Sequence, residues 1–184
     1  ANPSGKLAET WPKKYEDCVC SSYYGSKDAL YKEGIYVGYR YYDKAGVPVR
    51  WHFGHGLSYT QFDYSNLKLD GRMLELDLKN TGNYDGAEVV QLYISSKNHK
   101  CFRPVKELKA FRKIFLKKGE AAHLSFELED EFFSVWKGEW KIVAGDYDIL
   151  VGPLSTSISV KGEELNLSLG NWYDAPKGSP STET

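Results

Sequence analysis

The sequence predicts an antiparallel β-sandwich of about seven short strands, and three observations lead to this class. From Phe62 onward apolar and polar residues alternate in short runs. Turn-forming residues separate the runs at roughly ten-residue spacing, as in sandwich domains. No helical segment stands between the runs, and the only helical candidate, "LEDEFFSVW" (residues 128–136), is short enough to be a turn. The pattern therefore indicates an all-β domain.

The alternating runs also predict which side chains face the core. They are "RMLELDLKN", "AEVVQLYIS", "ELKAFRKIFLKKGE", "AAHLSFELED", "GDYDILVG" and "STSISVKG". Because successive side chains of a strand point to opposite faces, every second residue is expected inside. The expected inward residues are Leu74, Leu76, Leu78, Val90, Leu92, Ile94, Leu124, Phe126, Leu128, Tyr147, Ile149, Val151, Ile158 and Val160. The mixed charges of "RPVKELKAFRK" predict a solvated edge strand that resists edge-to-edge pairing.

Composition excludes several partners and cofactors. The chain has 184 residues, a net charge of −1 and 27% charged residues, so it carries no basic field for a nucleic acid. No apolar run approaches the ~20 residues that a membrane helix needs. Cys18 and Cys20 form a poor zinc half-site, and His52 and His55 have no acidic or cysteine ligand at metal-binding spacing. We expect neither a cofactor nor a metal.

The compartment follows only weakly from the sequence. The first residues, "ANPSGKLAETWP", lack the charged-then-apolar order of a signal peptide. The odd count of three cysteines argues against a disulfide scaffold. Both features favour a cytoplasmic location, and a secreted or periplasmic one stays open.

Six motifs in order are similar to one family of enzymes. They are "NPSGKLAETWP", "YKEGIYVGYRYYD", "FGHGLSYTQFDYS", "NTGNYDGAEVVQLYI", "RPVKELKAFRKIFLKKGE" and "GDYDILVG". From about residue 2 to about residue 163 the chain resembles the C-terminal part of family 3 glycoside hydrolases, of the β-glucosidase and β-xylosidase type. The resemblance implies three parts. Residues 1–60 would close an α/β sandwich domain as a loop-rich, extended aromatic segment, residues 61–165 would form an immunoglobulin/fibronectin type III-like sandwich, and residues 166–184 would be a linker or truncated extension.

The resemblance also implies where catalysis takes place. Such enzymes hydrolyse terminal non-reducing β-D-glucosyl or related residues with retention, which needs two carboxylates ~5 Å apart. The family's nucleophile is an Asp in a (β/α)8-like barrel of ~250 residues, and its acid/base is a Glu earlier in the α/β sandwich domain. No segment of this chain matches either context. We expect the chain to be inactive alone and to be a structural part that stabilises the barrel and α/β sandwich domains, its partners.

Two other functions stay open at this point. The chain could be an independent carbohydrate- or protein-binding module, with rings such as Tyr84, Tyr93 and Trp136 stacking on a β-linked oligosaccharide. It could also be an enzyme completed by another chain that supplies the barrel.

The tyrosine-rich stretch at residues 31–43 supplies most of the candidate site residues. The cleft-rim or interdomain candidates are Tyr31, Glu33, Tyr39, Arg40, Tyr41, Asp43 and His55, and none is assigned a catalytic role. Glu33 and Asp43 could be paired carboxylates, but local capping and a turn at "DKAGVP" are favoured. In extended structure Tyr39 and Tyr41 would share one face and Arg40 and Tyr42 the other. We favour a packed joint between domains, and we expect His55, between two glycines, in a tight turn.

Overall fold

The computed structural model describes residues 1–25, 27, 33–97 and 103–165, and it divides them into two compact units. The sandwich unit comprises residues 1–5, 56–97 and 106–165. The aromatic unit comprises residues 6–25, 27, 33–55 and 103–105. The tail predicted at residues 166–184 lies outside the described residues.

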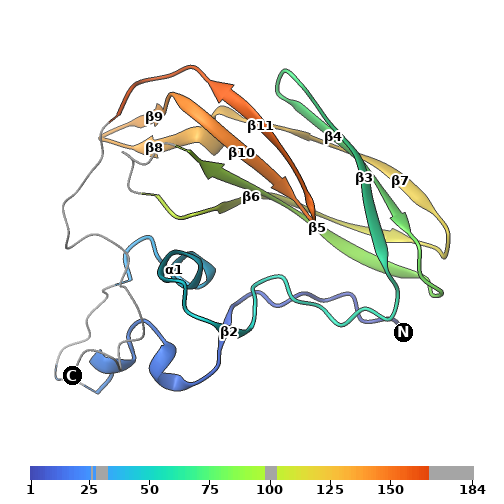
Figure 1. Cartoon of the computed structure of the whole chain (residues 1–184), viewed down its shortest axis with the longest axis horizontal. Helices are drawn as coiled ribbons and strands as arrows, with labels where there is room; N and C mark the ends of the chain where they lie inside the picture. Colours follow the sequence, from blue (N-terminus) through green and yellow to red (C-terminus); the bar gives the residue numbers. More distant parts are fainter. Residues whose placement is uncertain (26, 28–32, 98–102, 166–184) are drawn as a thin grey trace. The chain divides into compact units, whose positions relative to one another are not determined.

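The sandwich unit contains a four-stranded antiparallel sheet in the order β11-β10-β5-β6. The strands are β5 (Gly86–Ser96), β6 (Glu107–Leu116), β10 (Gly145–Val151) and β11 (Leu154–Val160). The longest strand, β5, lies inside the sheet, and β6 forms one edge (Figure 1). The mixed-charge segment is therefore an edge strand, as predicted.

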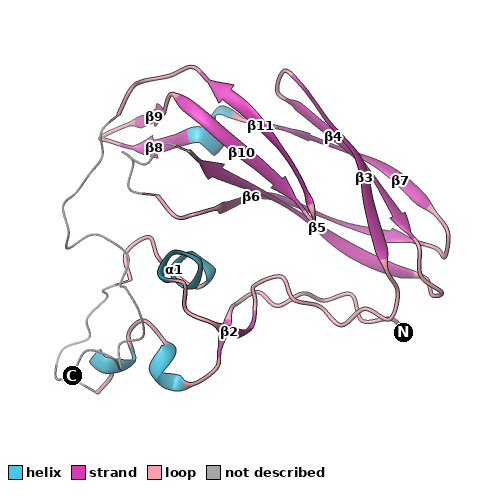
Figure 2. Ribbon diagram, viewed as in Figure 1, coloured by secondary structure: helices cyan, strands magenta, loops and turns pink. Residues whose placement is uncertain are grey.

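A three-stranded antiparallel sheet, in the order β3-β4-β7, forms the second layer. Its strands are β3 (Phe62–Asp70), β4 (Met73–Asn80) and β7 (Ala121–Glu127). The seven strands of the two sheets dominate this unit (Figure 2). The predicted all-β sandwich of about seven strands is confirmed.

The helical candidate of the sequence forms a turn followed by a hairpin. Asp130–Phe133 is a 3-10 helix, and the small antiparallel pair β8 (Ser134–Trp136) and β9 (Trp140–Ile142) follows it. Gly138 turns the chain between the two strands with φ 77°, a conformation that favours glycine.

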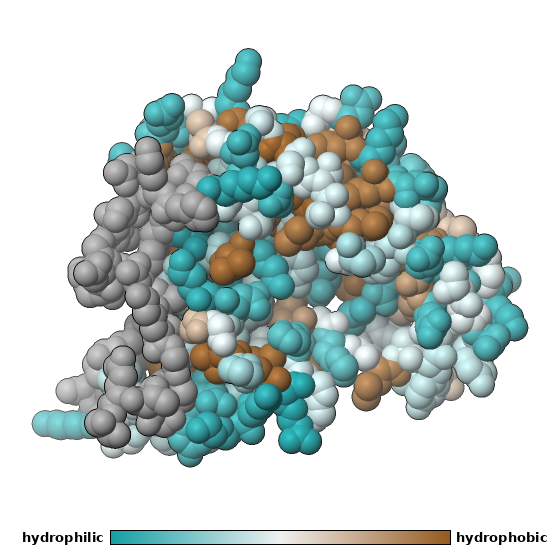
Figure 3. Space-filling model, in the orientation of Figure 1, coloured by the Kyte–Doolittle hydropathy of each residue, from teal (hydrophilic) through white to brown (hydrophobic). Residues whose placement is uncertain are grey.

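One continuous core lies between the sheets, and alternation along the strands supplies it. The buried cluster contains the predicted inward residues of β4, β5, β7 and β10 together with the predicted Leu128 and Val160, and Leu116, Phe132 and Phe133 join it. Ile158 is partly buried against this cluster. Burial of apolar side chains at about 25 cal/mol per Å² is the main favourable term in folding, so this cluster is what holds the sheets together. On the face shown in Figure 3, apolar residues also reach the surface over the strands.

A tyrosine and a carboxylate join the two sheets inside this core. The Tyr64 hydroxyl of β3 donates to Glu88 Oε1 of β5 at 2.9 Å. Burial, and then the charge of Glu88, raise the pKa of Tyr64, so its hydroxyl stays a proton donor. Gly152 faces the same ring, and a Cβ there would come within 2.9 Å of it. The ring therefore needs a glycine after β10.

The buried amide of Asn80 organises the turn regions at one end of the sandwich. Its Oδ1 accepts from the Thr60 hydroxyl at 2.6 Å and from the Gly82 N–H at 3.2 Å. Its Nδ2 donates to the carbonyls of Tyr84 at 2.8 Å and Leu116 at 3.1 Å. The side chain thus bonds backbone groups of the β4–β5 turn and of the last residue of β6.

In the aromatic unit the only α-helix of the described residues is α1 (Tyr39–Ala45), seven residues long. The unit also holds the short pair β1 (Trp11–Pro12) and β2 (Val49–Trp51), and two 3-10 turns at Tyr15–Asp17 and Ser21–Tyr23. The segment is loop-rich and aromatic, as predicted. No helix of the described part is long and apolar enough to cross a membrane.

The expected facing of the tyrosines was wrong, because residues 39–45 are helical. Glycines with positive φ stand at both ends, Gly38 at 60° and Gly46 at 67°, and allow the chain to enter and leave the helix sharply. Tyr41 and Tyr42 are adjacent in sequence and both buried, which strand alternation would not allow. A helix of two turns is too short for its 3.6-residue period to be recognised in the sequence.

We predict that Asn80→Ala destabilises the sandwich unit by about 3 kcal/mol, because it leaves buried hydrogen-bonding groups unsatisfied. The urea-unfolding midpoint measures the change. Asn83→Ala, an exposed change in the same turn, is the matched control and should stay within about 0.5 kcal/mol of the unmodified chain. Equal effects of the two substitutions would show that the amide does not organise this end.

The exposed cluster around His123 predicts a pH dependence of stability. His123 Nδ1 lies 2.8 Å from Asp77 Oδ1, and Asn66 Nδ2 donates to Asp77 Oδ2 at 2.8 Å. The hydrogen bond with Asp77 raises the pKa of His123 above 6.5. The bonds from Asn66 and His123 lower the pKa of Asp77 below 3.8. The histidine contribution is therefore lost as the pH rises through its raised pKa, and the aspartate contribution as the pH falls through its lowered one.

We expect the free energy of unfolding to decrease from pH 5.5 to pH 8.5 by more in the unmodified chain than in His123→Ala, because the contribution of a group with a raised pKa is lost as the pH rises through that pKa. Chemical unfolding at the two pH values measures it. His52→Ala, an exposed histidine of the aromatic unit, is the control and should keep the full dependence. Parallel pH profiles for His123→Ala and the unmodified chain would exclude this pair as the cause.

Candidate functional site

Helix α1 brings four of the predicted site residues together. Tyr39, Arg40, Tyr41 and Asp43 all lie within its seven residues. Glu33 precedes the helix, and its carbonyl accepts the Tyr36 N–H at 2.9 Å. Tyr31 lies outside the described residues. The segment is therefore a short helix with a supporting loop.

The tyrosines of this segment are packing residues. Tyr41 is fully buried, and its ring meets that of Tyr42 edge to face at 5.0 Å. Tyr36, Val19 and Val47 complete the cluster. Burial and the negative charge of Asp17 raise the pKa of Tyr41, so its hydroxyl stays protonated. A buried, neutral phenol has the properties of a structural group.

The other three predicted site residues of the helix, Tyr39, Arg40 and Asp43, are half-buried. Tyr39 packs its ring on Phe53 with centroids 5.1 Å apart. Tyr39 and Asp43 are four residues apart, so they share one side of the helix. Asp43 lies in its last turn, before the left-handed cap Gly46, where the sequence placed the start of a turn. The preference for local capping and a turn over a catalytic pairing of Glu33 with Asp43 stays a prediction, as does an interdomain role for Arg40.

His55 lies in the tight turn that its flanking glycines predicted. Its N–H donates to the His52 carbonyl at 3.0 Å, and its carbonyl accepts the Leu7 N–H at 2.8 Å. Gly54, with φ 82°, donates back to the Leu7 carbonyl at 2.9 Å. These backbone bonds fasten the turn to the N-terminal segment.

The His55 side chain contacts one ring of a small aromatic cluster. It stacks on Trp51 with centroids 6.4 Å apart, and Trp51 meets Trp11 edge to face at 5.3 Å. The Arg50 guanidinium lies 4.9 Å from the Trp51 ring centre, a cation–π contact. Trp11 and Trp51 lie opposite each other in the β1–β2 pair.

The described residues contain no group of three or more His, Cys, Asp or Glu side chains arranged to hold a metal. Cys18 and Cys20 are half-buried and belong to no disulfide among these residues. Cys101 lies outside the described part of the chain.

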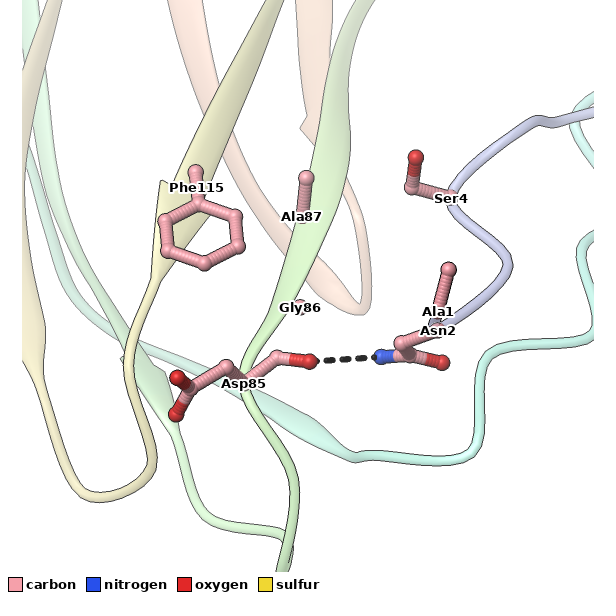
Figure 4. Close-up of a pocket in the computed structure, with 7 residues that line it drawn as sticks. All are labelled: Ala1, Asn2, Ser4, Asp85, Gly86, Ala87 and Phe115. Atoms are coloured by element: carbon pink, nitrogen blue, oxygen red, sulfur yellow. Dashed lines mark hydrogen bonds between the residues drawn. The ribbon is translucent and has the colours of Figure 1, made fainter.

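A hollow of about 400 Å³ in the sandwich unit is lined mainly by backbone and small side chains (Figure 4). Its lining residues are Ala1, Asn2, Ser4, Asp85, Gly86, Ala87 and Phe115. The Asp85 carboxylate accepts the Lys118 N–H at 2.8 Å, so it fixes a loop. The polar side chains of the hollow are the Asp85 carboxylate, the Asn2 amide and the Ser4 hydroxyl, and its one ring is that of Phe115.

Asn2 is the residue of this hollow whose role sequence reasoning missed. Its Nδ2 donates to Ser58 Oγ and to the Asp85 carbonyl, each at 3.2 Å, and its Oδ1 accepts the Tyr59 N–H at 2.8 Å. A Cβ on Gly86 would collide with this amide. The motif "NPSGKL" contained the signal, but only the fold shows that its asparagine ties the first residues to two distant loops.

The aromatic rings considered for sugar stacking are placed differently from one another. Tyr84 is exposed in the turn after Asn80, and Trp136 meets Trp140 edge to face at 5.6 Å across the β8–β9 hairpin. Tyr93 is half-buried, its hydroxyl donates to Gln91 Oε1 at 3.1 Å, and Lys106 lies 5.4 Å over its ring. They form no single platform, and oligosaccharide binding stays a prediction.

Most of the chain is similar in sequence to known proteins. Residues 88–155 match the model of the fibronectin type III-like domain. The chain is 40% identical over 173 residues to thermostable beta-glucosidase B of Acetivibrio thermocellus, a match of 87% of this chain and 23% of that protein. It is 42% identical over 168 residues to probable beta-glucosidase K of Emericella nidulans, 88% of this chain and 20% of that protein.

Solved structures agree with these relatives. The family 3 beta-glucosidase of Bifidobacterium adolescentis superposes with a TM-score of 0.81 at 35% identity, covering 94% of this chain and 28% of that one. Beta-glucosidase 3B of Thermotoga neapolitana, solved with glucose, superposes with a TM-score of 0.76 at 39% identity. The match covers 86% of this chain and 24% of that one.

The chain thus spans about a fifth to a quarter of the length of the curated relatives it matches, and most of their length has no counterpart in it. Because the match takes in 87% of this chain, it extends well beyond residues 88–155. The chain therefore has the sequence and the fold of the C-terminal portion of glycoside hydrolase family 3 enzymes, and the relatives that it matches are beta-glucosidases.

Proposed function

We propose that this chain is a non-catalytic, structural part of a family 3 β-glycosidase, which stabilises the domains that carry out hydrolysis. The parent activity would be hydrolysis of terminal non-reducing β-D-glucosyl or related residues with retention. The observation that carries the proposal is the unequal coverage. The match takes in 87% of this chain but 23% of the Acetivibrio thermocellus enzyme.

The chemistry of the candidate residues supports the same role. Tyr36, Tyr41 and Tyr42 are buried in a cluster of their own, and the His55 turn is held by backbone hydrogen bonds. Groups that act on a substrate must reach it within about 3 Å, and a buried, protonated tyrosine does not present its oxygen to a ligand. These features favour stabilisation over turnover.

The proposal predicts that the chain can replace the matching region of a relative. In a chimera, this chain would stand in place of the 173 matched residues of the Acetivibrio thermocellus enzyme. We expect the chimera to hydrolyse 4-nitrophenyl β-D-glucoside and the isolated chain to show no turnover. The relative without the region should lose thermal stability as well as activity. Turnover by the isolated chain, abolished by a substitution within it, would contradict the proposal.

A second prediction separates structural carboxylates from catalytic ones. In the chimera, Glu33→Gln and Asp43→Asn should each leave kcat within about tenfold, because loss of a general acid or base costs about 10²–10⁴-fold. Steady-state kinetics and the Tm of each variant measure the two effects. Glu9→Gln, an exposed acid of the same unit, is the control. A thousandfold loss of kcat with unchanged Tm would assign that carboxylate to catalysis.

A further inference from the structure

The outer face of the four-stranded sheet is divided into a polar and an apolar half. On β10 and β11 most outward side chains are acids and serines, several of which bond one another, and Leu150 lies on the same side at the end of β10. Ser157 donates to Asp148 at 2.6 Å, Ser159 donates to Asp146 at 2.5 Å, and Lys97 pairs with Asp148 at 2.8 Å. This half is built to face water.

The β5–β6 half carries large apolar side chains on the same outer side, with Gln91 and Lys113 among them. Register places Phe115 opposite Ala87, Lys113 opposite Val89 and Phe111 opposite Gln91. Tyr93 lies between Leu108 of β6 and Leu150 of β10. Paired residues of antiparallel strands point to the same side, so these side chains form one surface, here called the β5–β6 outer face. Figure 4 shows the Phe115 ring beside Ala87 at one end of it.

This surface leaves large rings in solvent. Phe111 is 69% exposed and Phe115 is 61% exposed. The alternate residues of the same strand, Ala110, Ile114 and Leu116, belong to or pack against the core. A strand with apolar residues on both sides is typical of a sheet covered on both faces, and contiguous exposed apolar surface marks an interaction site.

We propose that the β5–β6 outer face is the surface on which a folded domain of the parent enzyme, one outside this chain, packs. The inference rests on the proposed function and names the contact through which it acts. About three quarters of the Bifidobacterium adolescentis structure lies outside the 28% that this chain covers, which supplies an occupant of sufficient size.

Charge and chemistry favour a domain of the parent enzyme over a second copy of this chain and over a sugar. Lys106, Arg112 and Lys113 make the edge basic, so edge-to-edge pairing with a second copy would oppose like charges. A sugar needs several hydrogen-bonding groups beside the rings, and here Gln91 opposite Phe111 and Lys113 between the rings are accompanied by the apolar Val89 and Ala87, so the surface favours a protein with mixed apolar and polar groups. The partner surface is apolar, with carboxylate or carbonyl oxygens that accept from Lys113.

Lys113 reports on this contact without any substitution, because it lies between the two phenylalanines and is exposed. The experiment labels amines with an acetylating reagent and follows each lysine by mass spectrometry, in the isolated chain and in the active chimera. Lys137, exposed in the β8–β9 turn, is the internal control. We expect Lys113 to react about tenfold or more slowly in the chimera, since a covered amine is labelled only when the contact opens, and Lys137 to react equally in both.

A matched pair of variants gives a second reading. Phe111→Ser should lower the Tm of the chimera and leave the Tm of the isolated chain unchanged. Trp136→Ser, which changes a ring 64% exposed in the same unit, is the control and should change the Tm of the chimera and of the isolated chain by the same amount. An active chimera in which Lys113 reacts as fast as in the isolated chain would overturn the docking face and leave the proposed function standing. A chimera that does not hydrolyse the glucoside would contradict the proposed function, and the docking face with it.

Discussion

The packing of β5 against the facing sheet is the interaction on which the rest of the sandwich depends. Val90, Leu92 and Ile94 turn inward from the middle of one sheet and share a buried cluster with the leucines of β4. Because β5 is an inner strand, its position also fixes β6 and β10 on either side of it. The same alternation that buries one side of β5 presents Val89 and Tyr93 on the other, which links core formation to the outer face.

Polar groups complete this arrangement where strands end and apolar packing gives no direction. The Asn80 amide gathers backbone groups of the β4–β5 turn and of the last residue of β6, Asn2 ties the first residues to Ser58 and Asp85, and the Tyr64 hydroxyl meets Glu88 between the sheets. A buried amide whose partners are all supplied rigidifies its surroundings. The result is a rigid sandwich, a suitable support for a domain packed on its surface.

The sequence was most informative where a short period is repeated. Leu74, Leu76 and Leu78 predicted a strand and its buried face, and the structure confirms both. Helix α1 was missed because two turns carry too little periodicity, and Asn80 because an asparagine before "TGN" is typical of an ordinary turn. Phe111 and Phe115 stood in a run that its charges marked as solvated, so only the observed register separates their outer face from the core face.

The central claim is that this chain stabilises its parent enzyme through one apolar sheet face. Amide hydrogen exchange, compared between the isolated chain and the chain within an intact family 3 enzyme, tests it most directly. The account predicts added protection concentrated in the edge strand β6 and the adjoining β5, with β11 exchanging equally in both states. Unchanged exchange in β6, or protection confined to β11, would contradict it.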